Sequence, residues 1–469
     1  MRRGPVELDP WMVPVPVRTS TFVPLDRAHA PMNLEVDLAA IGAFFSPRAR
    51  QIAAADFQLL PDGVSRGRLG AGRAVHVRGH YLKGVGRTPL AANWRVADDA
   101  RHATGHLFAS AAVREYLVSR HAEARGIGDA IVPCTGVLFR PLPAGARPAI
   151  RAGLGSGPVP AIDLRFQAIS VKPAGFARLS NFSWALHQLD VAHAHIVELM
   201  LLFQRYLDPT TPVDPAACTP TTMTAALVAA IDRGFANFER YFAAGVNWGY
   251  LDNNVTADGR FLDLEVPAVL GGPCLGVLHT AAGATGARAS DRWVGLDALD
   301  FARRVQIFVE DLGSRLRFIA GSCAIQHAMV RQFAAALADE LDRAIPRGHR
   351  VRSPRALATW TAASIARTLD LGATGRRALR EVIDARQRYV ADQTDGAIGG
   401  PLRDTPLRLA IHAPGVQRYL RQPTWAPPLS PGALEEATRY NDAVRRVDQA
   451  RSIDELFAEL RRARAAIAR

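Results

Sequence analysis

Lysine is almost absent from this sequence. Of the 57 lysine and arginine residues only two are lysine, Lys83 and Lys172, and all the others are arginine. The simplest interpretation is that arginine has replaced lysine through a bias in the coding sequence. A lysine that persists against such a bias indicates a position that needs a compact ammonium group rather than a wide planar guanidinium group. Lys83 is therefore the first candidate for a functional residue.

Cysteines and long apolar runs are also scarce. The four cysteines lie far apart and form no CxxC pair, which argues against a disulfide framework and a cysteine zinc site. No run approaches the roughly 18 apolar residues of a membrane helix. The basic start, MRRGP, is not followed by the apolar segment of a signal peptide. We therefore expect a cytoplasmic protein without a membrane partner.

The charge is strongly positive. The 469 residues carry a formal net charge of +13, with 48% hydrophobic and 22% charged residues. Such a composition is typical of a globular protein, and the length allows two or more domains. A positive excess fits either a nucleic-acid partner or a phosphorylated ligand. Because the arginines are scattered, with no basic run and no nucleic-acid motif, we expect no nucleic-acid partner.

The first 182 residues are rich in strand patterns. Residues 1–60 form a proline-rich and partly helical N-terminal extension. In residues 72–84, GRAVHVRGHYLKG, apolar and polar residues alternate around Gly79, which predicts a strand hairpin. Residues 130–142 and 161–173 also resemble strands. Between them and the hairpin, residues 106–125 predict a helix that ends at the C-cap Gly126.

The remainder of the chain is predominantly helical. Helices are expected at 183–206, 220–244, 298–343, 353–371, 373–393 and 452–468. The order predicts an α+β fold with an extension (1–60), a strand-rich N-lobe (61–182) and a helical C-lobe (183–469). Such an asymmetry is typical of two-lobed phosphotransferases, and it is also compatible with unrelated α+β proteins.

The parts of a nucleotide-triphosphate site occur in a suggestive order. Phosphates bind to glycine-rich turns and a compact cation, which a helix glutamate orients, and Mg²⁺ prefers oxygen ligands. Glycine-rich turns lie at 66–74 and 83–89, and the cation is Lys83. The helix glutamate is Glu115, 32 residues later. Asn254 and Asp263, nine residues apart, are the candidate metal ligands.

These residues resemble the selenoprotein O family of protein-kinase-like AMP transferases. The similar segments are LGAGRA (69–74), LKGVGRTP (82–89), AVREYLVSRHAEARGIGDA (112–130) and AGVNWGYLDNNVTADGRFLDLEVP (244–267). The resemblance covers patches between residues 66 and 267. It implies a two-lobed kinase fold that binds ATP in a flipped orientation and moves AMP to a hydroxyl group of protein Ser, Thr or Tyr. A small-molecule acceptor is also open.

The resemblance also implies residue roles. Lys83 becomes the phosphate-binding lysine and Glu115 its helix partner, with Asn254 and Asp263 holding Mg²⁺ or Mn²⁺. The segment SVKPAGFARLS (170–180) stands where the family has two phosphate-binding arginines, so Lys172 and Arg178 become phosphate contacts. The remaining nucleotide contacts come from the glycine-rich turns: Gly70, Gly72, Arg73, Gly84 and Gly86.

The chain departs from the family at the catalytic base. The family has an aspartate directly before the metal-binding asparagine, and here that position is Asn253. Asp252 lies one residue earlier and is the candidate base. The family's DYG segment is here Asp263-Leu-Glu265, and the redox cysteine or selenocysteine of many members is absent. Two alternatives therefore stay open: a phosphotransferase on the same fold that acts on a small molecule, and a nucleotide-binding pseudoenzyme.

Overall fold

A computed structural model describes much of the chain. The described residues are 12–18, 23–25, 35–36, 63–69, 74–77, 80–84, 107–142, 160–173, 175–179, 219–247, 254–265, 268–269, 276–279, 291–294, 297–323, 325, 328–346, 348–377, 379–381, 383–384 and 431–467. The expected helix at 183–206 lies outside these residues, as does the turn at 70–73.

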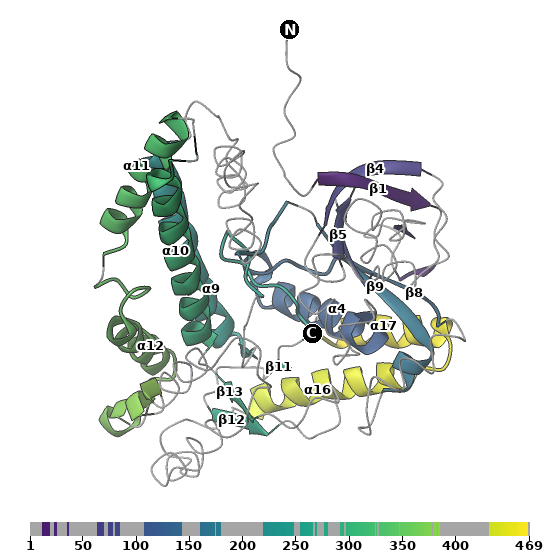
Figure 1. Cartoon of the computed structure of the whole chain (residues 1–469). Coiled ribbons are helices and arrows are strands. Elements are labelled where there is room, and N and C mark those ends of the chain that lie inside the picture. The colour runs from purple at the N-terminus through teal and green to yellow at the C-terminus, as the bar shows by residue number, and fades with distance from the viewer. Residues whose placement is uncertain are drawn as a thin grey trace.

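An antiparallel sheet dominates the N-terminal half (Figure 1). Its central strands follow the spatial order β4 (Gly63–Leu69), β5 (Ala74–Val77), β6 (His80–Lys83), β9 (Phe166–Pro173) and β8 (Gly136–Pro141). In the hairpin of β5 and β6, Ala74 pairs with Lys83 and Val77 with His80. The predicted hairpin at 72–84 is therefore confirmed, and β8 and β9 lie within the two expected strand segments.

Four more strands belong to this sheet, three towards its edges and one beside the central strand β9. They are β1 (Met12–Arg18), β2 (Val23–Pro24), β3 (Glu35–Val36) and β7 (Leu107–Phe108). Strand β1 pairs with β4 from Met12 opposite Arg68 to Val17 opposite Gly63. Part of the expected N-terminal extension is thus built into the sheet. Four further strands form two separate pairs: β10 (Val246–Asn247) with β11 (Ala268–Val269), and β12 (Gly276–His279) with β13 (Asp291–Val294).

Helix α4 (Ala109–Ala124) confirms the helix expected at 106–125. Its first turn has no local side-chain cap, but Asp163 of the short helix η2 (Ala161–Leu164) accepts hydrogen bonds from the backbone N–H and the hydroxyl of Ser110. This remote carboxylate satisfies N-terminal donors of the helix. At the other end Gly126 has φ +68°, and Ile127 N–H donates to the carbonyl of Ala122. This is the expected glycine termination of a helix.

The helical part contains α9 (Pro220–Ala243), α10 (Asp297–Gly321), α11 (Ala328–Ala344) and α12 (Pro354–Thr368). Thr219 and Thr222 cap α9 reciprocally, with Pro220 in the first turn, and Ser353 caps α12. These confirm the helices expected at 220–244 and 353–371. Described residues between 373 and 384 are also helical.

The prediction of one helix over 298–343 is wrong. The chain forms two helices, and α10 ends at Gly321, where Ser322 N–H turns back to the carbonyl of Ile319. Helices α10 and α11 pack against each other and against α9. One continuous helix could not pack the apolar face of its first half and that of its second half into the same compact core. The chain therefore turns at Gly321-Ser322.

The last two helices, α16 (Pro431–Asp448) and α17 (Ile453–Ile467), form a hairpin. Helix α17 confirms the expectation for 452–468, whereas α16 was not expected. The hairpin packs against α4, and α17 also contacts β8, so this end of the helical region lies against the sheet side of the molecule (Figure 1). Arg165 reaches from η2 to the carbonyl of Ala450 between the two helices.

One hydrophobic core connects the sheet with the helices. It contains Leu117 of α4, Phe139 of β8, Phe238 of α9 and Leu312 of α10, all buried. The fold is therefore α+β, with an antiparallel sheet and a mostly helical remainder. Among the helices of the described segments, none combines the length and the apolar character needed to cross a bilayer.

Candidate functional site

Lys83 lies at the end of a central strand. On β6 it pairs with Ala74 of β5 and with Ser170 of β9, and its side chain is buried. Gly84 follows with φ +103°, where a Cβ atom would lie 2.6 Å from the carbonyl oxygen of Ala168. Only glycine fits this position without strain, because the backbone is left-handed and the carbonyl oxygen of Ala168 belongs to a paired strand and cannot move aside as a side chain could. The glycine thus lets the chain turn directly after Lys83.

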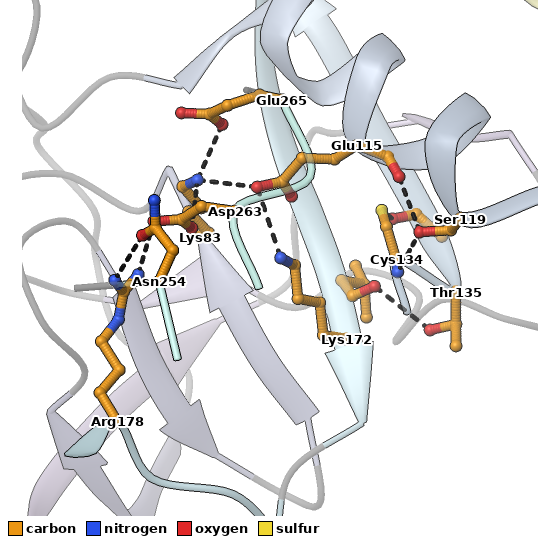
Figure 2. A network of polar contacts seen from close by, with 12 residues as sticks. Lys83, Glu115, Ser119, Cys134, Thr135, Lys172, Arg178, Asn254, Asp263 and Glu265 are labelled. Atoms are coloured by element: carbon orange, nitrogen blue, oxygen red, sulfur yellow. Dashed lines mark hydrogen bonds and ion pairs between the residues drawn. The ribbon is translucent and has the colours of Figure 1, made fainter. Parts of the chain in front are cut away.

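Three carboxylates converge on the Lys83 ammonium group (Figure 2). Nζ donates hydrogen bonds of 2.7 Å each to Glu115 on α4 and to Asp263 and Glu265 on the loop that follows α9. An ammonium group has three N–H donors. All three are therefore engaged by carboxylate oxygens from segments that lie 32, 180 and 182 residues away in the sequence.

Glu115 is shared by both lysines of the chain. Lys172 Nζ, on β9, lies 3.4 Å from the Glu115 oxygen that accepts from Lys83, and both Lys172 and Glu115 are fully buried. Burial by itself would raise the pKa of Glu115, but the charges of Lys172 and Lys83 outweigh it and lower that pKa to about 2. Lys172 Nζ makes no hydrogen bond to the described residues. Its contact with Glu115 is thus a charge interaction alone.

A small hydrogen-bond network fixes α4 against the segment before β8. Ser119 Oγ donates to the Glu115 carbonyl and accepts from the backbone N–H of Cys134, both at 2.7 Å (Figure 2). Thr135 donates from its backbone and hydroxyl groups to the carbonyl of Val171, next to Lys172. Burial, and then the charge of Glu115, raise the pKa of the Cys134 thiol to about 12. Cys134 is therefore a neutral packing residue beside the charged cluster.

The loop at 254–265 is held to α9. Thr256 N–H donates to Arg260, and Leu262 N–H donates to the Asn254 carbonyl, which closes a tight hairpin. Gly259 at its tip has φ +80° and lies so close to α9 that a Cβ atom would come within 2.7 Å of Gly234 N. Asn237 of α9 donates to the Gly259 carbonyl. The helix thereby fixes where Asn254 and Asp263 emerge.

Arg178 joins the two candidate metal ligands. Its guanidinium group donates to Asn254 Oδ1 at 3.0 Å and to Asp263 Oδ2 at 2.8 Å. Burial would lower the pKa of Arg178, but the charge of Asp263 more than compensates and raises it. Burial likewise opposes ionisation of Asp263, and Arg178 and Lys83 together hold the pKa of Asp263 well below its ordinary value. Asp263 is therefore a carboxylate at neutral pH.

Asp263 also has a rare backbone conformation, with φ +59°. A non-glycine residue in this region costs about 1–3 kcal/mol, and such residues gather at functional sites. The left-handed backbone directs both carboxylate oxygens inward, one to Lys83 and one to Arg178. The ion pairs hold the strained conformation in place.

The donor set fits a divalent cation of the magnesium type. Asn254 and Asp263 present amide and carboxylate oxygens to one shared guanidinium group, so the two oxygens lie close together. Mg²⁺ commonly takes one or two protein oxygen ligands and completes its shell with phosphates and water. The described residues contain no group of three or more His, Cys, Asp or Glu side chains that could hold a metal. Asn254 and Asp263 could therefore hold a metal only together with other ligands, such as phosphates and water.

The structure brings together all the predicted site residues that it describes: Lys83, Glu115, Lys172, Arg178, Asn254 and Asp263, with Gly84 at the turn. Asp252, Asn253, Gly70, Gly72, Arg73 and Gly86 lie outside the described residues. Sequence reasoning did not assign a role to Glu265. Its position two residues after Asp263 was the only signal, and alternate residues of an irregular loop have no fixed relative orientation.

Comparison with protein-family models, with curated proteins and with solved structures finds no match to this chain. The functional interpretation therefore depends on the residues and their geometry.

Proposed function

We propose that this protein is an ATP-dependent AMP transferase of the selenoprotein O type, with a two-lobed protein-kinase-like fold. The observation that supports this best is the ion pair between Lys83 and Glu115 at 2.7 Å, with Asp263 on the same ammonium group. In protein kinases a strand lysine pairs with a helix glutamate and lies near a metal-binding aspartate. The same three residue types meet here from a strand, a helix and a loop.

The order of elements around Lys83 supports the proposal. Counted from β4 along the chain, the lysine lies on the third strand, β6. The two-residue strand β7 and then the helix with Glu115 follow it, before β8 and β9. The glycine-rich segment with Gly70 and Gly72 connects the first two strands of this set, β4 and β5, which pair at Leu69 and Val75. A glycine-rich connection over the phosphates, then a strand lysine, is the order that protein kinases use.

The charges of the cluster suit a polyphosphate. Three acids, Glu115, Asp263 and Glu265, balance three cations, Lys83, Lys172 and Arg178, within one connected network. A bound triphosphate brings excess negative charge, which these cations would share. A divalent ion on Asn254 and Asp263 would supply further neutralisation of the phosphate charge. Preorganised charges of this kind are the main catalytic device in phosphorus transfer.

In the proposed reaction the acceptor hydroxyl oxygen bonds to the α-phosphorus of ATP, and the bond from that phosphorus to the bridging oxygen breaks. Pyrophosphate leaves with the bonding electrons, and the hydroxyl proton passes to Asp252. Lys83 holds the phosphates in line, and Glu115 fixes the direction of its ammonium group. The acceptor is a Ser, Thr or Tyr hydroxyl of a protein, or a small molecule.

The test is to incubate the purified protein, with Mg²⁺ or Mn²⁺, with ATP labelled in turn at the α- and γ-phosphorus. Label from the α-phosphorus on the protein or an added acceptor, lost in Lys83→Ala, supports AMP transfer. Arg439→Ala, an exposed arginine of α16, is the matched control for loss of a charge. Label from the γ-phosphorus alone would instead establish phosphoryl transfer. ATP binding without any transfer would identify a nucleotide-binding pseudoenzyme, and full transfer by Lys83→Ala would overturn the assignment.

A further inference from the structure

We propose that Glu265 competes with the phosphates of the nucleotide for Lys83, and so makes tight nucleotide binding depend on a divalent cation. The inference rests on the proposed function and adds a regulating residue to that site. The Glu265 carboxylate accepts a hydrogen bond from one N–H of the lysine that the nucleotide would need. The phosphates and this carboxylate are then alternative partners of the same ammonium group.

The competition follows from the donors of Lys83. Its ammonium group donates to three carboxylates at 2.7 Å each, which uses every N–H that it has. The lysine side chain is only 4% exposed, so it has little room to turn to a new partner. A phosphate oxygen that binds Lys83 must therefore replace one of the three carboxylates.

Glu265 is the carboxylate best suited to leave. Glu115 is fully buried on α4, where Lys172 also faces it. Asp263 has its second oxygen fixed by Arg178, and its short side chain sits on a left-handed backbone. Glu265 is 17% exposed where Glu115 is fully buried, and its side chain has one more rotatable bond than that of Asp263, so a change of rotamer is easier for it than for either.

Electrostatics links this movement to the metal. Phosphate and the Glu265 carboxylate carry charges of the same sign and repel each other when both approach Lys83. A divalent cation that arrives with the phosphates offsets that repulsion. Without the cation, the nucleotide has to displace Glu265 unaided. Loss of the Glu265 charge should therefore strengthen binding of the metal-free nucleotide, and the gain should grow with the number of phosphates.

The experiment measures binding of ATP, ADP and adenosine by calorimetry, each with excess EDTA and with excess Mg²⁺. The proteins are the full-length chain, Glu265→Gln and Glu265→Ala. Glu310→Gln is the matched control, because Glu310 is an exposed residue of α10 that contacts Gln306, and its substitution changes the net charge equally. In EDTA both Glu265 variants should bind ATP about tenfold more tightly than the unmodified chain. Their affinity for adenosine should not change.

The outcomes separate this inference from the proposed function. If the unmodified chain binds Mg²⁺–ATP but the Glu265 variants gain no affinity in EDTA, the competition does not exist and the proposed function is unaffected. An equal gain for adenosine or in Glu310→Gln would also overturn it, because the effect would then not concern the phosphates at Lys83. If the unmodified chain binds ATP under neither condition, the proposed function fails and this inference fails with it.

Discussion

Lys172 Nζ lies 3.4 Å from Glu115 Oε1, the same oxygen that accepts a hydrogen bond from Lys83. The two lysines that this arginine-rich chain retains therefore share one buried carboxylate. They contribute differently to it, because Lys83 makes hydrogen bonds to three carboxylates and Lys172 makes none to the described residues. Substitution of Lys83 and of Lys172 should therefore differ in their effects on stability and on nucleotide binding.

The substitution Lys172→Met should have little effect on stability. It removes an ammonium group whose desolvation is not repaid by hydrogen bonds, while Glu115 keeps its bond to Lys83. We expect a change within about 1 kcal/mol in the free energy of unfolding, because Glu115 remains paired with Lys83 and no buried charge is left without a partner. Lys83→Met, in contrast, leaves three carboxylates without their shared cation and should cost about 3–5 kcal/mol.

Urea unfolding of the two variants tests this difference, and ATP binding tests the role of Lys172. If Lys172 contacts phosphate, Lys172→Met should bind Mg²⁺–ATP about tenfold more weakly in spite of its normal stability. A large loss of stability together with unchanged ATP affinity would show that Lys172 serves the fold alone.

Glu115→Gln should impair transfer without removing the nucleotide site. Glutamine keeps the size of the side chain but not the charge that directs Lys83, and misplacement of a catalytic group by about 1 Å typically costs about a hundredfold in rate. The measurement is the rate of label transfer from ATP at saturating Mg²⁺. Glu123→Gln is the control on the same helix, since Glu123 is exposed and forms an ion pair with Arg120, three residues earlier. Equal rates for Glu115→Gln and the unmodified protein would contradict the role of Glu115.

The core of this site was accessible from sequence because its parts are local. A strand that ends in Lys-Gly and an alanine-rich helix with Glu115 are both determined by short-range patterns. Strand pairing then brings Lys83 opposite Ser170 of β9, and Lys172 lies two register pairs away, opposite Tyr81. Only the pairing of Lys83 with Glu115 had to be inferred from the resemblance to the family.

The rest depended on long-range contacts that no local pattern encodes. Glu265 reaches Lys83 because Asp263 adopts φ +59°, which a spacing of two residues does not predict. The break between α10 and α11 also follows from the need to bury two apolar faces in one core. The attachment of α16 and α17 to α4 joins segments more than 300 residues apart, as in the hydrogen bond of Arg125 to Glu436.

Glycine 84 offers a graded test of the turn after Lys83. Gly84→Ala places a methyl group on a backbone that is left-handed and 2.6 Å from the carbonyl oxygen of Ala168. We expect it to lower the free energy of unfolding by about 3 kcal/mol or more. Gly126→Ala has the strain of a left-handed backbone but no close contact, since nothing lies within 4 Å of the added Cβ. It should cost about 1 kcal/mol of stability. Gly372→Ala meets neither and should be nearly neutral. Thermal unfolding of the three variants gives the order, and a Gly84 variant no less stable than Gly372→Ala would refute the close approach.

The end of α16 contains a carboxylate with unusual titration. Burial, and in addition the negative charge of Asp163, raise the pKa of Asp448 from 3.8 to about 7, against the opposing charge of Arg114. Asp448 Oδ1 has no hydrogen-bond partner among the described residues. The folded protein therefore binds a proton at Asp448 that the unfolded chain releases above pH 4. Between about pH 4 and pH 7 this group makes folding less favourable as the pH rises, and above pH 7 the penalty stays constant.

Asp448→Asn should abolish that penalty, because the amide keeps the shape of the side chain and has no charge to desolvate. At pH 8 we expect the variant to be more stable than the unmodified protein by about 2–4 kcal/mol, and at pH 4 the two should be nearly equal. Chemical unfolding at several pH values measures the difference, in which the titration of all other groups cancels. Asp442→Asn, an exposed position of the same helix that pairs with Arg445, should show no such trend. A stability gain of Asp448→Asn that is the same at pH 4 and pH 8 would mean that packing, not ionisation, sets the effect.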